Sequence, residues 1–176
     1  MKIKGIEFIE FIGEAEIQNK VEALAAEINK AYADKTPVFL PVLNGSFMFA
    51  ADLLKNVTIP SRVSFVKISS YEGLSSTGQL KTLIGLDESL FKQDVLVVED
   101  IVDTGLTLDR ILSELKSLGT GSVEVVALLR KKSARERALD IKFAGFDIED
   151  EFVLGYGLDY DGIGRNHRQL FKAMKK

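Results

Sequence analysis

Residues Val95 to Leu108 read V-L-V-V-E-D-I-V-D-T-G-L-T-L, and the rest of the chain is arranged around them. The first part of this stretch is almost entirely β-branched, which is typical of a strand buried on both faces of a parallel sheet. Two acids, Glu99 and Asp100, come next. After two further apolar residues, Asp103 to Thr107 forms a small turn that runs into a helical pattern. The stretch therefore predicts a strand, a turn and the start of a helix.

The turn offers the groups that bind a phosphate monoester. In open α/β sheets, ligands collect at the carboxyl ends of the strands, where the next helix points its unpaired amides outward. The backbone amides of the turn, two threonine hydroxyls and a glycine that allows close approach all suit an anion. These residues are Asp103, Thr104, Gly105, Leu106 and Thr107. Glu99 and Asp100 would repel a bare phosphate, but they suit sugar hydroxyls or a magnesium ion that arrives with a polyphosphate. The combination predicts a site for a phosphorylated sugar.

An ordinary strand-turn-helix could use the same residues. In that interpretation Asp103 or Thr104 is the helix N-cap, and Glu99 and Asp100 are solvated loop residues. The order of an apolar strand, two acids, two apolar residues and D-T-G-x-T is far more specific than a lone D-T-G. It resembles the signature with which the phosphoribosyltransferase family binds 5-phosphoribosyl 1-pyrophosphate (PRPP).

The composition fits one globular domain. The chain has 176 residues, of which 46% are hydrophobic, and a formal net charge of -3. It has no long basic run, which argues against a nucleic-acid-binding surface because phosphate backbones need clustered Lys and Arg. It has no cysteine, which excludes disulfides and thiolate metal sites and is compatible with a reducing compartment. We find no secretory signal and no stretch of roughly 20 apolar residues that could span a membrane, so we expect a cytoplasmic protein.

Strands alternate with helices along the chain, which predicts an α/β fold with a central, mostly parallel sheet flanked by helices on both faces. Apolar spacing predicts helices over residues 14–33, 47–54 and 108–118. It predicts strands over residues 38–43, 62–68, 79–86, 95–98, 122–129, 143–146 and 152–156. Residues 69–78 should be a mobile loop. We expect a single domain, 1–176, with a core over about 14–130. A small hood, formed by the N-terminal residues and about 131–176, should cover the carboxyl edge of the sheet.

Four blocks resemble the hypoxanthine-guanine branch of the phosphoribosyltransferases and span about residues 42–165. They are V-L-N-G-S-F at 42–47, S-Y at 70–71, the central stretch, and L-L-R-K-K with F-V-L-G-Y-G-L-D-Y downstream. The resemblance implies the type I phosphoribosyltransferase fold. It also implies transfer of the 5-phosphoribosyl group from PRPP to nitrogen 9 of hypoxanthine or guanine. The implied substrates are PRPP and a 6-oxopurine base, the implied cofactor is Mg²⁺, and the implied assembly is a homodimer or homotetramer.

The resemblance assigns several residues to the purine. Asp103 would face nitrogen 7 and accept the proton lost as the glycosidic bond forms. Lys131 would hydrogen-bond the 6-oxo group, and Phe152 would stack on the base. Backbone groups of Val153 and Asp159 would complete the recognition of the base edge.

The resemblance also assigns a pyrophosphate loop, formed by Asn44, Gly45 and Ser46, and an arginine, Arg165. Many relatives carry Lys or Arg where this chain has Asn44. We therefore expect the amides of Gly45 and Ser46 to make the main contacts of this loop. In the family the peptide bond before this position is cis, which would here be Leu43–Asn44.

The remaining assignments concern the ribose, the metal and a loop. Glu99 and Asp100 would contact the ribose hydroxyls, and together with Asp159, acting through water, they would hold the magnesium. Ser70 and Tyr71 would close over the reacting centre and exclude water.

Simpler interpretations stay open for several of these residues. Lys131 lies in a basic run, and such runs are usually solvated faces. Phe152 could be plain core, Tyr71 a loop aromatic without function, and Asn44 with Gly45 a tight turn. For the whole protein, two alternatives remain: a phosphoribosyltransferase that prefers xanthine, and a non-catalytic regulator that senses PRPP.

Overall fold

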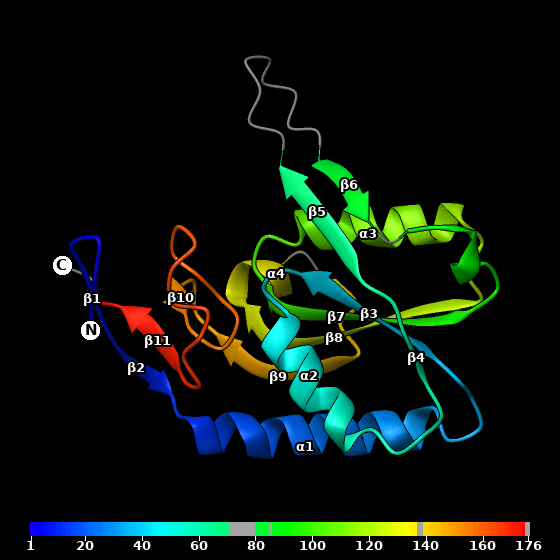
Figure 1. Ribbon diagram of the computed structural model, residues 1–176, viewed down its shortest axis with the longest axis horizontal. Helices are drawn as coiled ribbons and strands as arrows, with labels where there is room; N and C mark the ends of the chain where they lie inside the picture. The colour runs from blue at the N-terminus through cyan, green and yellow to red at the C-terminus, as the bar shows by residue number, and fades with distance from the viewer. Residues whose placement is uncertain (71–79, 85, 137–138, 175–176) are drawn as a thin grey trace.

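The computed structural model describes residues 1–70, 80–84, 86–136 and 139–174. The fold is built on one large sheet. Its strands are β3 (Val38–Leu43), β4 (Arg62–Val63), β5 (Val66–Ser70), β6 (Leu80–Ile84), β7 (Asp94–Val102), β8 (Ser122–Lys131) and β9 (Phe143–Ile148). The order is β6-β5-β3-β7-β8-β9, and β4 also pairs with β3. β5 and β6 are antiparallel, whereas the other pairs are parallel. This confirms the predicted α/β fold with a mostly parallel sheet (Figure 1).

Helices cover both faces of this sheet. They are α1 (Glu14–Ala31), α2 (Phe47–Asn56), α3 (Leu106–Ser117), α4 (Lys132–Glu136) and a short 3₁₀ helix, Glu88–Leu90. The alternation of side chains along β7 explains the arrangement. Leu96 and Val98 pack into the core beneath α1 and α2, while Val95 and Val97 pack on the opposite face with α3. All four are fully buried, as the β-branched run predicts for a strand covered on both faces.

The strand β7 is longer than predicted, and this changes the position of the two acids. It continues past Val98 to Val102, with Glu99 opposite Ala127 of β8. Glu99 and Asp100 are therefore strand residues, only 6% and 7% exposed. The interpretation that makes them solvated loop residues is wrong.

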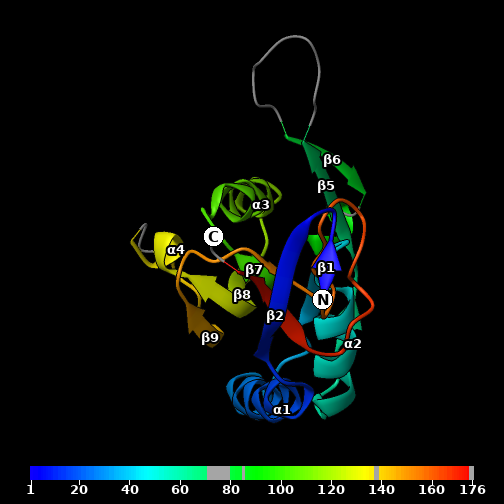
Figure 2. The same cartoon turned by 90° about the vertical axis from the view of Figure 1, so that its left-hand side faces the viewer.

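A second, smaller sheet lies at one side of the large sheet (Figure 1) and contains the first and last strands of the chain; it faces the viewer in Figure 2. Its strands are β1 (Lys2–Ile3), β2 (Ile6–Ile12), β10 (Val153–Leu154) and β11 (Leu170–Ala173), in the order β1-β2-β11-β10. Its pairings are antiparallel. The expected hood also included the strand at 143–146, and that part is wrong. β9 pairs with β8 at the edge of the large sheet, because Phe143 and Ile148 are buried in the core beneath α1.

Other boundaries differ by smaller amounts. The strand predicted over 62–68 is interrupted at Ser64 and Phe65 and becomes the separate strands β4 and β5. Most of the loop expected at 69–78, including Tyr71, lies outside the described residues. None of the helices that the structure describes has the length and apolar character needed to cross a membrane.

Candidate active site

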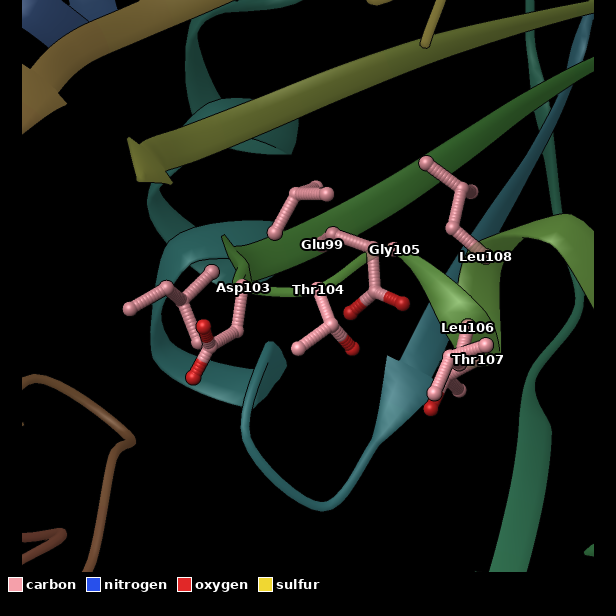
Figure 3. Close-up of a pocket in the computed structure, with 9 residues that line it drawn as sticks. Glu99, Asp103, Thr104, Gly105, Leu106, Thr107 and Leu108 are labelled. Atoms are coloured by element: carbon pink, nitrogen blue, oxygen red, sulfur yellow. The ribbon is translucent and has the colours of Figure 1, made fainter. Parts of the chain in front are cut away.

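The turn between β7 and α3 places a small cavity at the carboxyl end of the central strand. Gly105 is the N-cap of α3 and has φ 78°, a left-handed conformation that glycine adopts easily. The N-cap position is occupied by Gly105, so the interpretation of Asp103 or Thr104 as the N-cap is wrong. The turn and the first turn of α3 surround a cavity of about 90 Å³ (Figure 3). All five turn residues of the predicted phosphate site line it: Asp103, Thr104, Gly105, Leu106 and Thr107. Backbone amides at a helix N-terminus therefore face a hollow that suits an anion.

A larger cavity of about 290 Å³ adjoins the same strand and gathers residues from distant parts of the chain. Its lining includes residues of the loop after β3, of β7 and α3, and of the segment after β10. The predicted site residues that line it are Gly45, Glu99, Asp100, Thr107, Asp159 and Arg165. The structure thus brings the predicted metal and ribose residues to one cavity, together with two of the four predicted pyrophosphate residues, Gly45 and Arg165.

The two buried acids have perturbed protonation. Burial raises the pKa of Glu99 well above its ordinary range, and the neighbouring charge of Asp100 adds to this effect. Burial also raises the pKa of Asp100 to about 6, although hydrogen bonds from the amides of Ile101 and of Asp100 itself, and the charge of Arg165, act in the opposite direction. Two neighbouring buried acids with raised pKa values are typical of a functional site.

The loop after β3 lies directly against Asp100. A Cβ atom added at Gly45 would come within 2.0 Å of Oδ2 of Asp100, so the backbone approaches the acid more closely than any side chain would allow. The Leu43–Asn44 peptide bond is cis, which confirms the expectation from the resemblance. The side chain of Asn44 is exposed.

Ser46 departs from its expected position as a pyrophosphate contact. It is fully buried. Its hydroxyl and its amide both donate to the carbonyl of Val42, over 2.7 Å and 3.3 Å. Its polar groups are therefore used to hold the loop to β3, and the expected contact of its amide with a ligand does not fit this arrangement.

Lys131 and Asp103 form an ion pair at the ends of β8 and β7. Nζ of Lys131 lies 2.7 Å from Oδ2 of Asp103. The lysine side chain is only 12% exposed and the aspartate side chain 54% exposed. The interpretation of Lys131 as part of a solvated face is therefore wrong. Ser133, which the sequence did not single out, donates through its hydroxyl to the carbonyl of Asp103 over 3.1 Å. In the sequence, Ser133 is marked by its position alone, two residues after Lys131; in the structure it lies in the first turn of α4.

Arg165 and Asp159 form a second ion pair. Nη2 of Arg165 lies 2.6 Å from Oδ1 of Asp159, and Nη1 donates to the carbonyl of Gly157 over 2.7 Å. Within the part of the chain that the structure describes, no three His, Cys, Asp or Glu side chains are grouped so that they could hold a metal by themselves. Glu99, Asp100 and Asp159 nevertheless offer carboxylate oxygens to one cavity, and Mg²⁺ is commonly bound by one or two carboxylates with water and substrate phosphates. The donor set fits a magnesium ion that enters with a polyphosphate.

An exposed aromatic ring lies at the start of β10. Phe152 is 46% exposed, so it is not plain core. It contacts Phe8 at a centroid distance of 6.1 Å and meets Tyr160 edge-to-face at 5.4 Å. Val153, the next residue, is buried. Ser70 is the last residue of β5. Its side chain and the whole of Tyr71 lie outside the part of the chain that the structure describes.

Comparison with known proteins agrees with this geometry. A family model described as a phosphoribosyl transferase domain matches residues 13–161. The hypoxanthine phosphoribosyltransferase of Buchnera aphidicola is 41% identical over 152 residues, which cover 85% of this chain and 86% of that protein. The hypoxanthine-guanine phosphoribosyltransferase of Bacillus subtilis is 40% identical over 156 residues, covering 88% and 87%. A crystal structure of a hypoxanthine-guanine phosphoribosyltransferase from Bacillus anthracis superposes with a TM-score of 0.87 at 34% identity and covers 96% of this chain and 99% of that one. The chain therefore belongs to the phosphoribosyltransferase family, in the group of the hypoxanthine-guanine phosphoribosyltransferases.

Proposed function

We propose that this protein is a purine salvage enzyme that transfers the 5-phosphoribosyl group from PRPP to nitrogen 9 of hypoxanthine or guanine, giving IMP or GMP and pyrophosphate. The observation that carries the proposal is the pairing of Asp103 with Lys131 at the edge of an anion-binding turn. One group of this pair accepts a proton and the other donates a hydrogen bond. They stand next to a hollow of the kind that binds a phosphate.

The sugar phosphate occupies the carboxyl end of β7 in this proposal. The amides of Asp103 to Thr107 hold the 5-phosphate, with the hydroxyls of Thr104 and Thr107 as further donors. Glu99 and Asp100 accept hydrogen bonds from the ribose hydroxyls. The transition state carries positive charge on the ribose ring, so buried acids beside the ring stabilise it electrostatically.

The purine lies over the Asp103–Lys131 pair. The Asp103 carboxylate accepts the proton from nitrogen 7 as the glycosidic bond forms. The Lys131 ammonium donates to the 6-oxo group. Phe152 offers its exposed face for stacking, and backbone groups of Val153 and Asp159 bind the edge of the base. The 6-amino group of adenine would present a donor to Lys131, which favours 6-oxopurines.

Pyrophosphate leaves toward Gly45 and Arg165, which line the larger cavity. Glu99, Asp100 and Asp159 would hold Mg²⁺, which when bound supplies positive charge against the pyrophosphate oxygens. Arg165 orients the leaving group, and the amide of Gly45 contributes without a neighbouring basic side chain, because Asn44 has no charge. No covalent nucleophile is needed, since the reaction relies on positioning and electrostatics.

Three further features belong to the proposal. Ser70 and Tyr71 close over the bound substrates and exclude water. The protein works as a homodimer or homotetramer, which the molar mass from light scattering would test. The reaction takes place in the cytoplasm, where the absence of cysteine is compatible with reducing conditions.

A substrate panel tests the function. Pyrophosphate release from PRPP and Mg²⁺ should be measured with hypoxanthine, guanine, xanthine and adenine separately. We expect turnover with hypoxanthine or guanine and very little with adenine. Faster turnover of xanthine would favour a xanthine-preferring enzyme. PRPP binding without turnover of any base would favour a PRPP-sensing regulator instead.

A further inference from the structure

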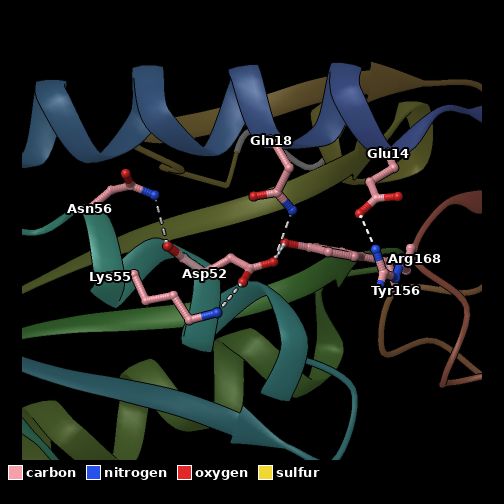
Figure 4. A network of polar contacts seen from close by, with 7 residues as sticks. All are labelled: Glu14, Gln18, Asp52, Lys55, Asn56, Tyr156 and Arg168. Carbon is pink, nitrogen blue, oxygen red and sulfur yellow. Dashed lines mark hydrogen bonds and ion pairs between the residues drawn. The ribbon is translucent and has the colours of Figure 1, made fainter.

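Tyr156 belongs to a polar network, centred on the Asp52 carboxylate, that joins three parts of the fold. Its side chain is 1% exposed, and its hydroxyl donates to Oδ2 of Asp52 in α2 over 2.7 Å. The same oxygen accepts from Nε2 of Gln18 in α1 over 2.9 Å, and Oδ1 is paired with Lys55 (Figure 4). Burial and the neighbouring Asp52 raise the pKa of Tyr156, so the phenol stays protonated and donates. Burial alone would raise the pKa of Asp52, but the hydrogen bonds from Lys55, Gln18 and Tyr156 outweigh it and lower that pKa, so the acceptor is a carboxylate.

The backbone next to Tyr156 contacts the two segments that carry the proposed pyrophosphate-binding residues, the loop with Gly45 and the segment with Arg165. A Cβ atom added at Gly157 would lie 2.0 Å from the carbonyl oxygen of Gly45, so the two chain segments are in direct backbone contact. On its other side, Gly157 accepts from Nη1 of Arg165 and donates its amide to the Arg165 carbonyl, over 2.7 Å and 2.9 Å. The segment that carries Tyr156 therefore lies between the loop after β3 and Arg165.

The Asp52 end of the network connects to the same loop. α2 begins at Phe47, immediately after that loop, and Asp52 lies in its second turn. The hydroxyl of Tyr156 thus ties the helix that follows the loop to the segment that positions Arg165. Neither Tyr156 nor Asp52 lines the cavity that holds Gly45, Asp159 and Arg165.

We infer that Tyr156 is a positioning residue, which fixes the spacing between the Gly45 loop and Arg165 and thereby sets the affinity for pyrophosphate and for the pyrophosphate group of PRPP. This inference rests on the proposed function for the identity of the ligand. It predicts a selective effect, because IMP carries the base and the 5-phosphate but has no pyrophosphate group. Loss of the Tyr156 hydroxyl should weaken PRPP and pyrophosphate binding and leave IMP binding unchanged.

The test uses Tyr156→Phe, which keeps the buried ring and removes only the hydroxyl. A cavity of about 310 Å³ lined by Gln18, Asp52 and Tyr156 adjoins the network, so water can replace the lost donor. The matched control is Tyr32→Phe. Tyr32 is 2% exposed and donates to Oε2 of Glu124 over 2.7 Å, but Glu124 lies at the opposite end of β8 from Lys131. Both variants lose one buried hydrogen bond from a tyrosine to a carboxylate.

Titration calorimetry with PRPP and Mg²⁺, with pyrophosphate and Mg²⁺, and with IMP gives the readout. For Tyr156→Phe we expect PRPP and pyrophosphate to bind about tenfold more weakly, the size expected for one hydrogen bond to a charged group, and IMP to bind within about twofold of wild type. Tyr32→Phe should lower the melting temperature about as much as Tyr156→Phe does, but it should change none of the three affinities. The inference is overturned if pyrophosphate affinity is unchanged in Tyr156→Phe, or if IMP affinity falls equally.

Asp52→Ala approaches the same link from α2 and serves if Tyr156→Phe does not fold. It should show the same selectivity, and combining it with Tyr156→Phe should add little further loss, because both changes break one link. The readout is binding and does not depend on turnover. Wild type that binds PRPP and pyrophosphate but releases no product would overturn the proposed function alone. Wild type that binds neither ligand would overturn both.

Discussion

Replacing Asp100 by asparagine should make the protein more stable and less able to bind PRPP. The Asp100 side chain is 7% exposed and lies beside the buried Glu99. Burial raises its pKa to about 6, even though two backbone hydrogen bonds and Arg165 favour the charged form. At neutral pH the folded protein without ligand therefore carries a carboxylate in a place where it costs folding free energy. A charge kept at such a cost is expected where a positive partner binds.

The sign and size of the effect follow from the pKa. Asp100 has an ordinary pKa of 3.8 in the unfolded chain. Below that pH the carboxyl group is protonated in both the folded and the unfolded state, so burying it costs no folding free energy for a charge. Between pH 3.8 and about 6 the folded state keeps a proton that the unfolded state releases, and stability falls as the pH rises. A change of one in pKa is worth about 1.4 kcal/mol, so the full effect is about 3 kcal/mol above pH 6.

Asp100→Asn removes this dependence on pH. The amide that replaces the carboxylate must itself be hydrogen-bonded, which we expect to reduce the gain to about 1.5 kcal/mol. For a chain of this length that corresponds to a rise of roughly 3 to 6 °C in melting temperature. Thermal unfolding should be followed without magnesium from about pH 4 to about pH 8, with the gain present at the upper end and absent at the lower end.

Asp94→Asn is the matched control, because Asp94 lies on the same strand and has the opposite shift. A hydrogen bond from Ser122 lowers the pKa of Asp94, burial opposes this, and Lys35 assists it. The folded pKa is below the unfolded one, so Asp94 contributes stability above its unfolded pKa and loses it as the pH falls. Asp94→Asn should therefore lower the melting temperature at neutral pH. The reasoning about Asp100 is refuted if Asp100→Asn is no more stable than wild type near pH 8, or if its gain persists unchanged near pH 4.

Three further predictions concern turnover. Asp103→Asn should lower kcat by about 10²- to 10⁴-fold in a pyrophosphate-release assay while PRPP still binds, and a variant with the wild-type rate would remove Asp103 as the proton acceptor. Adenine should be poorer than hypoxanthine in kcat/KM by at least roughly 10- to 100-fold, because its amino group meets the Lys131 ammonium, and efficient turnover of adenine would contradict this role. Arg165→Ala should raise the Michaelis constant for PRPP far more than Asn44→Ala does, and Asn44→Lys should be tolerated. Equal effects of the two alanine variants in steady-state kinetics would show that Arg165 does not carry the charge that Asn44 lacks.

Apolar spacing predicted the elements whose neighbours are themselves apolar. The strand β3 begins and ends at the predicted residues, because a continuous apolar run lies between Pro37 and the turn at Asn44. The helix α1 begins at the predicted Glu14, since its buried positions recur with helical spacing. These elements are defined by local sequence, which is what periodicity reports.

The sequence failed where pairing between strands decides the outcome. The end of β7 was missed because Glu99 and Asp100 are charged, and charged residues usually mark the end of a buried strand. Pairing with β8 extends the strand through them. The strand β9 was assigned to the hood for a similar reason. Its length and composition predict a strand, but nothing in its own residues says which sheet it joins, and β8 supplies that partner. Sheet membership is a long-range property that apolar spacing does not encode.

The sequence also did not predict the two ion pairs of the site, although all four residues were singled out as site residues. These pairs are Lys131 with Asp103 and Arg165 with Asp159. Each was assigned to a ligand, whereas in the free protein each acid neutralises a nearby cation. A charge that is only 12% exposed, such as that of Lys131, would be costly without such a partner. A base that binds Lys131 therefore exchanges one partner of the ammonium for another and gains little net affinity from that contact. The same exchange fails for adenine, whose amino group cannot replace the carboxylate as an acceptor. Lys131 should consequently act on the choice between bases more than on the affinity for the correct one.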